Sequence, residues 1–352
     1  MVEEDQLKDF VKDNANTDKT LIYKKIIISS KTMQQIKTTR HTEVPILINS
    51  SYDLSKFKFS LKKNRFKICD VKSSEFEKYI ESLHPGKLSL KAIREERVCD
   101  NKYAIIKDNC SDITIEDNEN DIYNVFHLLL IIFPSDLSIY WIMKYKESEG
   151  NVQHSINKYF FPYNNDNPLT SSEEYLDEIN DFINIAFERL NYINKQHKNL
   201  YVKVTIGNYI NSFNQLTLIE YRYLALCIAL ESIISGNNEL TYRISRSAAI
   251  LCGRDKEECE TIFNNVKKIY KLRSKIVHGE KFDRSNLNNY FIMLRNLVSR
   301  VIIELLIHNI EENRELDDRI TAIGYGNRNN ISENWKEYIL NQEIYKSLNS
   351  KL

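Results

Sequence analysis

The period of the hydrophobic pattern changes near residue 170, and this change limits the folds open to the chain. Before that point, segments such as LIYKKIIISS (21–30) and KFKFSLKKNRFKICDV (56–71) alternate apolar with basic positions, which is typical of half-exposed strands. After it, apolar residues return at every third or fourth position, as they do along one face of a helix. The pattern therefore predicts an α+β protein in which strands precede a helical region.

A loop-forming segment separates the two regions. FPYNNDNPLTSS (161–172) gathers Pro, Asn, Asp and Ser, which favour turns over regular structure. We place a domain boundary there, between a mixed α+β domain at 1–165 and an all-α bundle at 170–352. A chain of 352 residues is long enough for two such domains.

In the first region we expect a short helix at 73–84, capped by Ser73 or Ser74, and further strands at 112–117 and 138–145. The apolar run IYNVFHLLLIIF at 122–133 is too short to span a bilayer and ends at a proline. A buried strand or a short core helix explains this run better.

In the second region the helices carry start and stop signals. Ser171 with Glu174, and Asp255 with Glu258, have the spacing of a capping residue and its acidic partner three positions later. Gly279 stands where a helix cap belongs. The segment 214–235 is apolar nearly all round, which predicts a buried central helix. We expect helices at 171–196, 214–235, 240–251, 255–278, 285–310 and 332–348.

Composition excludes several broad classes. Lys plus Arg and Asp plus Glu balance at 49 each, so no overall charge draws the chain to nucleic acid or to a membrane. The acidic N-terminus lacks the apolar core of a signal peptide, and the six cysteines form no CxxC pair. These features predict a cytoplasmic protein with reduced thiols and no membrane contact.

The histidines and glycines provide no familiar ligand or phosphate motif. No phosphate-binding glycine loop, dinucleotide fingerprint or nucleophile elbow is present, so nucleotide hydrolysis, dinucleotide binding and esterase chemistry are not first choices. His127 is interpreted as a core histidine. The remaining histidines outside the motif described next lack Cys, Asp or Glu at ligand spacing, so we expect no metal and no cofactor: His41, His84, His154, His197 and His308.

One segment, KIYKLRSKIVHGEKF (268–282), combines Arg273 with His278 at the end of a basic helix. Five residues turn a helix by about 140°, so the two side chains would not share a face. As a structural feature, cationic groups near a helix C-terminus complement its dipole, worth about 0.3–1 kcal/mol. As a functional feature, histidine suits proton transfer and arginine suits phosphate charge, as RNA cleavage without a metal requires.

The spacing RSKIVH resembles the Arg-x4-His signature of HEPN domains, and the stretch 215–310 resembles the ApeA-like branch of that superfamily. The matching segments are LALCIALESIIS, LTYRISRSAAIL and IYKLRSKIVHGEKF. The resemblance implies a helical dimer in which two motifs face each other, as in metal-independent endoribonucleases of prokaryotic defence and toxin systems. Arg273 would then stabilise the phosphate and His278 would act as acid and base, with Ser274 beside them as a supporting polar residue.

Other residues near this motif have two interpretations. Glu231 lies in an apolar helix, so its carboxylate needs a partner; Arg243 or Arg246 is the simple choice, and orienting Arg273 is the alternative. Arg243 and Arg246 either join helices or contact RNA phosphates, and we favour the structural use for at least one. A cluster of lysines flanks the motif and is expected to attract RNA: Lys267, Lys268, Lys271, Lys275 and Lys281.

A second basic segment lies in the first region. KFKFSLKKNRFK interleaves Phe57, Phe59 and Phe66 with lysines and an arginine. This segment either presents a basic face to nucleic acid or directs its phenylalanines into the core of a half-buried sheet. The second interpretation is favoured.

The sequence thus predicts a HEPN endoribonuclease that cleaves RNA through a dimeric Arg-x4-His site, as an anti-phage or abortive-infection effector. Its first region would sense a phage-derived or partner-protein trigger or restrain the nuclease. Its partners would be RNA and at least one further copy of the chain. The alternative is a non-catalytic HEPN module that dimerises and binds RNA or a partner.

Overall fold

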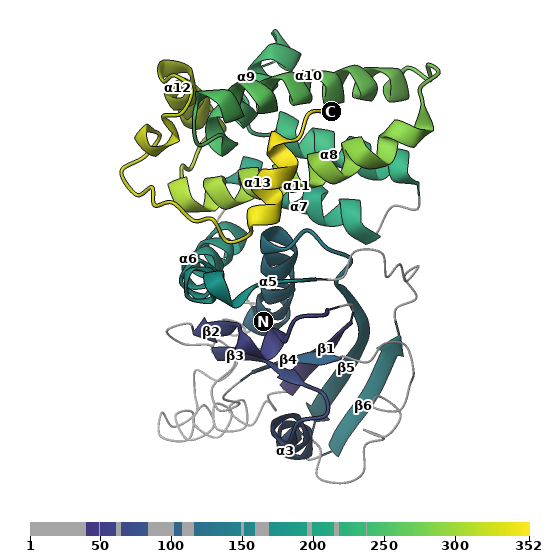
Figure 1. Ribbon diagram of the computed structural model, residues 1–352. Coiled ribbons are helices and arrows are strands. Elements are labelled where there is room, and N and C mark those ends of the chain that lie inside the picture. The colour runs from purple at the N-terminus through teal and green to yellow at the C-terminus, as the bar shows by residue number, and fades with distance from the viewer. Residues whose placement is uncertain are drawn as a thin grey trace, which may run out of the picture.

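The computed structural model confirms the α+β class, with a sheet toward the N-terminus and helices toward the C-terminus (Figure 1). The strand expected at 21–30 lies outside the described residues, as does most of the strand expected at 112–117. The structure describes residues 40–48, 50–60, 65–83, 102–107, 116–148, 151–158, 169–195, 199–214, 218–236 and 238–352.

Within these residues, six strands form one antiparallel sheet in the order β2-β3-β4-β1-β5-β6. The strand expected at 138–145 corresponds to β5. The strands are β1 (Arg40–Ile48), β2 (Lys58–Ser60), β3 (Arg65–Asp70), β4 (Tyr103–Lys107), β5 (Ser138–Ser148) and β6 (Asn151–Lys158).

The alternation in KFKFSLKKNRFK follows the two faces of strands β2 and β3. Phe57, Phe59 and Phe66 are all buried, while their neighbours Lys58 and Lys67 are exposed. Because successive side chains of a strand point to opposite faces, the phenylalanines fill the core. The interpretation of this segment as a half-buried sheet is confirmed for the described residues.

Helices cover both faces of the sheet. Helix α3 (Ser74–Leu83) packs Phe76 and Ile80 on one face, and the Phe76 amide donates to the Ser73 hydroxyl as the predicted cap. On the other face lies α5 (Glu116–Ile132), which resolves the apolar run at 122–133 as a core helix. Helix α5 is apolar on several sides because it lies between the sheet and the helical region (Figure 1).

The helical region contains four of the expected helices at nearly the expected bounds, and α8 over part of its predicted span. Two helices, α7 and α12, were not predicted, and residues 332–341 are not helical, so the terminal helix is shorter than expected. The helices are α6 (Leu176–Lys195), α7 (Leu200–Asn214), α8 (Ile219–Glu231), α9 (Leu240–Cys252), α10 (Lys256–Val277), α11 (Arg284–His308), α12 (Asn313–Ala322) and α13 (Gln342–Asn349).

Two local predictions in this region are wrong. The Ser171 hydroxyl donates to the Ser172 carbonyl instead of capping a helix, because a short 3-10 turn, Glu173–Tyr175, precedes α6. Helix α8 is also not buried all round, since Tyr221 and Ile228 are 56% and 46% exposed. The central helix is α11, which contacts α5, α6, α7, α8, α9 and α13.

One hydrophobic core contains residues from both sides of the expected boundary at 161–172. It joins Leu47 and Ile105 of the sheet to Phe187 of α6 and Val301 of α11, and the rings of Phe66 and Phe187 lie 5.9 Å apart. The division into two domains stays a prediction, but the two parts share their core.

Among the described residues, no helix has both the length and the apolar character needed to cross a bilayer.

Candidate active site

Helix α10, which carries Arg273, is capped at both ends as its sequence predicts. At the start, the Glu258 amide donates to Asp255 Oδ1 at 2.9 Å. At the end, the Gly279 amide donates to the Ile276 carbonyl and the Glu280 amide to the Lys275 carbonyl, at 3.2 and 2.9 Å. This pair of bonds is a Schellman motif, and Gly279 has the positive φ of 67° that the motif requires. The helix therefore ends at His278 for a local reason.

Arg273 projects from α10 toward α8 and contacts Glu231, which is the last residue of that helix. Arg273 Nη2 lies 3.2 Å from Glu231 Oε1, and the two side chains are 30% and 23% exposed. Two tyrosine hydroxyls join the same helices beside this pair, since Tyr223 donates to the Ile269 carbonyl and Tyr270 to the Cys227 carbonyl, at 2.9 and 3.1 Å. Glu231 therefore holds Arg273 at the contact between α8 and α10 and leaves the Arg273 side chain partly open to solvent.

His278 is the C-cap residue of α10, and it is exposed. Its backbone amide donates to the Ser274 carbonyl at 3.0 Å. Its imidazole makes no hydrogen bond and no ion pair with any residue that the structure describes. The neighbouring Ser274 is also exposed. Both imidazole nitrogens are thus available to a ligand, while Arg273 lies about 140° away around the helix, as its spacing predicts.

The structure corrects the expected partner of Glu231. Arg243 forms an ion pair with Asp317 of α12. Arg246 donates to the carbonyls of Ile320 and Ile323, at 2.8 and 2.7 Å. Both arginines hold α12 and its C-terminal end against α9, so their structural use is confirmed and neither pairs with Glu231.

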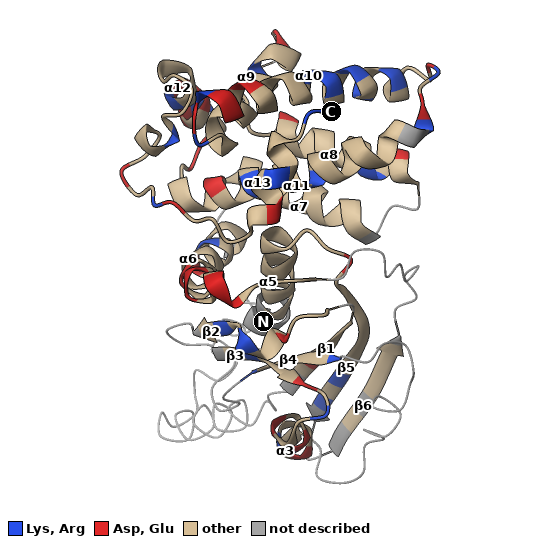
Figure 2. Ribbon diagram, in the orientation of Figure 1, with Lys and Arg blue, Asp and Glu red and all other residues tan. Residues whose placement is uncertain are grey.

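The five lysines of the predicted RNA-binding set have different surroundings. Lys267 and Lys271 are exposed on the outer face of α10, Lys275 is half-buried, and Lys281 is exposed beyond the helix end. Lys268 instead donates to the carbonyl of Leu352, so it holds the end of the chain against α10. Figure 2 shows basic residues toward the C-terminal end of α10, whereas Glu257 and Glu258 lie in its first turn.

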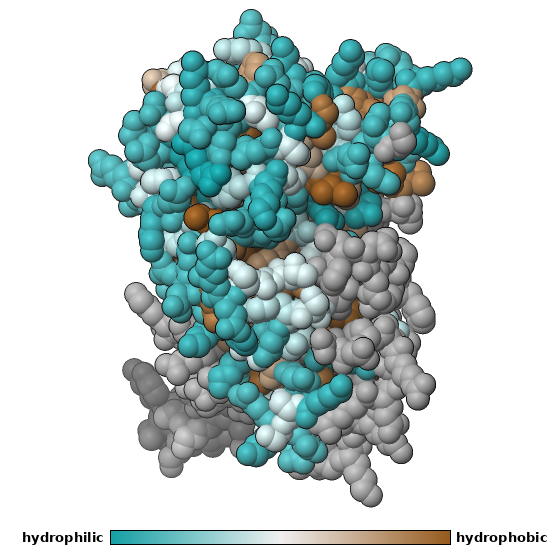
Figure 3. All heavy atoms as spheres, in the orientation of Figure 1, coloured by the Kyte–Doolittle hydropathy of each residue, from teal (hydrophilic) through white to brown (hydrophobic). Residues whose placement is uncertain are grey.

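Apolar side chains lie exposed on both sides of the Arg273–Glu231 pair. Ile228 precedes Glu231 by one turn and is 46% exposed, and Val277 follows Arg273 by one turn and is 49% exposed. In the space-filling view, brown apolar side chains interrupt the hydrophilic surface over the helical part (Figure 3). Sequence reasoning missed the exposure of Ile228, because the apolar pattern of 214–235 predicted burial on every side of that helix.

The described cysteines are free and buried: Cys69, Cys227, Cys252 and Cys259. Cys227 lies one turn before Glu231, and burial raises the pKa of its thiol, with a smaller contribution from Glu231. A thiol held protonated in this way is a poor nucleophile. Among the residues that the structure describes, no three His, Cys, Asp or Glu side chains gather at metal-binding distance.

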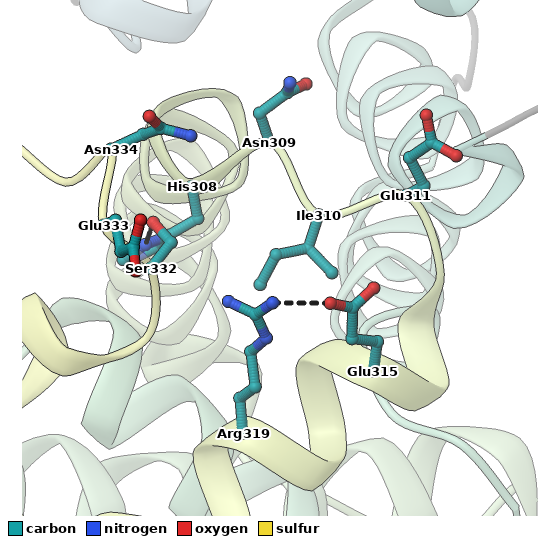
Figure 4. Close-up of a pocket in the computed structure, with 9 residues that line it drawn as sticks. All are labelled: His308, Asn309, Ile310, Glu311, Glu315, Arg319, Ser332, Glu333 and Asn334. Atoms are coloured by element: carbon teal, nitrogen blue, oxygen red, sulfur yellow. Dashed lines mark hydrogen bonds and ion pairs between the residues drawn. The ribbon is translucent and has the colours of Figure 1, made fainter.

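A second polar cluster lies at the C-terminal end of α11, beside a cavity of 460 Å³ (Figure 4). His308 Nδ1 is 2.8 Å from the Ser332 hydroxyl, and Nε2 is 3.5 Å from Glu304 Oε2. This order of serine, histidine and carboxylate is the order of a hydrolase triad. Glu304 stands one helical turn before His308. The expectation that His308 has no Cys, Asp or Glu at metal-ligand spacing is therefore wrong.

The second cluster is nevertheless closed to a substrate. The His308 side chain is 0% exposed, so its ring cannot reach a leaving group. Glu304 also pairs with Arg300 and with Arg328, so its carboxylate is shared among three side chains of the buried cluster. The cluster therefore joins α11 to the segment that follows α12, and α10 remains the better candidate.

The chain matches no protein-family model, no curated protein and no solved structure. The resemblance to HEPN domains thus rests on the residues of this sequence alone.

Proposed function

We propose that this chain is a metal-independent endoribonuclease of the HEPN type, which cleaves RNA through Arg273 and His278 in a homodimer. One observation carries the proposal: Arg273 is held by Glu231 and is still 30% exposed, while His278 stands exposed at the end of the same helix. A fixed arginine that solvent can reach and an imidazole with two open nitrogens are the groups that the reaction needs.

The chemistry follows from these two side chains. The 2′-oxygen of the RNA attacks the adjacent phosphorus and loses its proton, a bond from 2′-oxygen to phosphorus forms, and the bond from phosphorus to the 5′-oxygen breaks. Imidazoles take up the first proton and supply the second to the leaving 5′-oxygen. The guanidinium stabilises the charge on the phosphorane. The products are a 2′,3′-cyclic phosphate and a 5′-hydroxyl.

Two copies of the chain would complete this site. Arg273 and His278 lie on different sides of α10, about 140° apart, so one copy does not direct both toward the same phosphate. A second copy would bring the missing base or acid. The exposed Ile228 and Val277 lie next to the Arg273–Glu231 pair. A dimer interface at this place would bury their apolar surface.

The biological setting is proposed from the sequence resemblance. The enzyme would act in the cytoplasm as an anti-phage or abortive-infection effector, and the part that contains the sheet would respond to a phage-derived or partner-protein trigger. Growth arrest on expression that depends on His278 would support this setting, and unchanged growth in the presence of phage would count against it.

The second candidate function is a non-catalytic HEPN module that dimerises and binds RNA or a partner. The contact between Glu231 and Arg273 favours it, since a carboxylate beside an arginine is also a simple device for joining α8 to α10. In that case Arg273 serves stability and His278 has no chemical role.

Incubation of the purified protein with single-stranded RNA in EDTA separates the two functions. The nuclease should shorten the RNA and leave a cyclic phosphate or 3′-phosphate on the upstream fragment. Arg273→Ala and His278→Ala should each abolish this product in a folded protein. Intact RNA at every protein concentration would favour the non-catalytic module, and 3′-hydroxyl ends that need magnesium would contradict the mechanism.

A further inference from the structure

Three aromatic rings gather where α9, the first half of α10 and the segment after α12 meet. The rings of Tyr242 and Phe263 lie edge to face, with centroids 5.8 Å apart and planes at 79°. The ring of Tyr325 also lies close to Phe263, with centroids 6.5 Å apart. Arg246 holds the carbonyl of Ile323, which places Tyr325 beside the other two rings.

Tyr242 presents much of its ring to solvent. It is 53% exposed, and its hydroxyl makes no hydrogen bond with the residues that the structure describes. The edge-to-face contact with Phe263 orients the Tyr242 ring without burying it. A large, oriented and open aromatic ring is the feature on which a nucleobase stacks.

A line of basic and polar side chains leads from these rings to His278. Lys267 Nζ lies 5.5 Å from the centre of the Phe263 ring. Lys267, Lys271, Ser274 and His278 follow at steps of three or four residues and are all exposed, so they form one stripe along the outer face of α10. From Phe263 to His278 the helix rises by about 22 Å, which is long enough for several nucleotides.

Acidic side chains lie around the aromatic rings, at the end of the basic stripe that is nearest the start of α10. Glu260 lies one turn before Phe263 and pairs with Lys256 at 3.8 Å, and Glu257 and Glu258 lie in the same first turn. Glu239, the residue before α9, is exposed near Tyr242. These carboxylates repel phosphate, so a polyanion bound at Tyr242 would extend toward Lys267 and Lys271 and away from the start of α10.

We propose that Tyr242, supported by Phe263, is a base-stacking site for single-stranded RNA, and that Lys267 and Lys271 bind the phosphates between this site and His278. The choice of RNA as the ligand rests on the proposed function. A duplex keeps its bases stacked on each other, so only an unpaired base can lie on the tyrosine. The substrate of the α10 site is therefore single-stranded and is held upstream or downstream of the cut by one stacked base.

Binding of a labelled 2′-O-methyl oligoadenylate of about ten nucleotides, followed by fluorescence anisotropy, tests this inference. This oligonucleotide lacks the 2′-hydroxyl nucleophile, so it measures binding without cleavage. Tyr242→Ala should weaken binding roughly 5- to 150-fold, as the loss of one stacked base does, and Tyr242→Phe should keep the affinity. Tyr192→Ala is the matched control, since Tyr192 is 39% exposed on α6 and should leave binding unchanged.

Two further measurements make the test specific. Lys267→Gln should reduce the slope of log affinity against log salt concentration by about 0.7, the value for one phosphate of a single strand. Tyr242→Leu keeps apolar contact with Phe263 but removes the aromatic face, so it should bind as weakly as Tyr242→Ala in a protein with unchanged melting temperature. Tyr242→Ala should not change the affinity for a duplex of the same length.

The outcomes separate this inference from the proposed function. Equal affinity of wild type, Tyr242→Ala and Tyr242→Leu would overturn the stacking site, even if the wild type cuts RNA. A failure of the wild type to bind any single strand would overturn it as well. A wild type that never cuts RNA but loses affinity on Tyr242→Leu would contradict the nuclease and leave the stacking site supported.

Discussion

Arg273 of α10 meets Glu231 of α8 with 3.2 Å between Nη2 and Oε1. Because water reaches both side chains, their attraction is screened and contributes at most about 1 kcal/mol to stability. Glu231 Oε1 itself is buried and makes no well-aligned hydrogen bond within the described residues. The main consequence of this contact is the direction in which the guanidinium points.

Glu231→Gln therefore tests whether Glu231 orients the guanidinium of Arg273 for catalysis. We expect kcat to fall roughly 10- to 100-fold, since misplaced groups lose rate steeply. The KM for RNA should fall or stay the same, because a negative charge beside the phosphate site is removed. Single-turnover and steady-state cleavage assays measure the two constants. Glu220→Gln is the matched control, since Glu220 lies on the same helix and pairs with Arg284 at 3.1 Å. A rise in KM with unchanged kcat would contradict the positioning role.

His278→Ala and Arg273→Ala test the chemistry. Loss of the imidazole should lower kcat by roughly 10²–10⁴-fold, as for other general acids and bases, with little change in melting temperature because the side chain is exposed. Arg273→Ala should be similarly inactive, and the double variant should lose little more, since residues of one catalytic unit act non-additively. Arg314→Ala, at an exposed arginine of α12, should cut normally. A folded His278→Ala protein that cuts at the wild-type rate would end the assignment.

Ile228→Glu tests assembly. If the exposed Ile228 and Val277 lie in a dimer contact beside Arg273, a buried charge there should dissociate the dimer and abolish cleavage together, because an unpaired charge is costly to bury. Sedimentation and cleavage are measured on the same sample. Leu200→Glu is the control, since Leu200 is 66% exposed on α7. A monomeric Ile228→Glu protein that retains full activity would show that one copy suffices.

Gly279→Ala tests the end of α10. Gly279 has a φ of 67°, and an added Cβ would meet nothing within 4 Å, so the cost is backbone strain alone, about 1–2 kcal/mol. Gly207 within α7 also has an open Cβ position, but its substitution by alanine should stabilise the protein by about 0.5–1 kcal/mol. Urea unfolding of both variants should thus give free energies of unfolding that change in opposite directions. Equal changes in the free energy of unfolding for the two variants would mean that the Schellman motif does not stabilise the C-terminal end of α10.

Glu304→Gln tests the buried ion cluster. Burial alone would raise the pKa of Glu304, but Arg300, His308 and Arg328 together lower it from 4.5 to about 2. The unfolded chain therefore binds a proton before the folded protein does as the pH falls, so this group stabilises the fold above about pH 4.5 and loses its contribution toward pH 2. The substitution should cost about 3–5 kcal/mol at pH 7, because it leaves buried arginines unpaired.

The free energy of unfolding from pH 2 to pH 7 checks this expectation. The difference between wild type and Glu304→Gln should shrink as the pH falls. Glu315→Gln is the control, because Glu315 and Arg319 form a half-exposed pair, 47% and 43% exposed, worth at most about 1 kcal/mol. A difference that does not depend on pH would show that the charge of Glu304 does not stabilise the fold.

Much of the α10 helix could be predicted from the sequence. Asp255, Glu258 and Gly279 act on backbone groups within a few residues of themselves, so their roles follow from spacing alone. The same holds for the 140° that separate Arg273 from His278, and for the alternation that buries Phe57, Phe59 and Phe66. Local hydrogen bonds and side-chain periods are properties of the chain segment itself.

The tertiary structure decided which distant groups meet. The partner of Glu231 is Arg273 rather than Arg243 or Arg246, because the neighbours of a helix face depend on how helices pack and not on their order in the chain. Helix α7 went unpredicted for the same reason: LYVKVTIGNYINSFN is rich in β-branched residues, and packing against α8 and α11 makes it helical. Exposure of Ile228 and Tyr242 is likewise set by the elements that cover a surface. Local physics thus fixed where the candidate residues lie on their helices, and packing fixed what each of them faces.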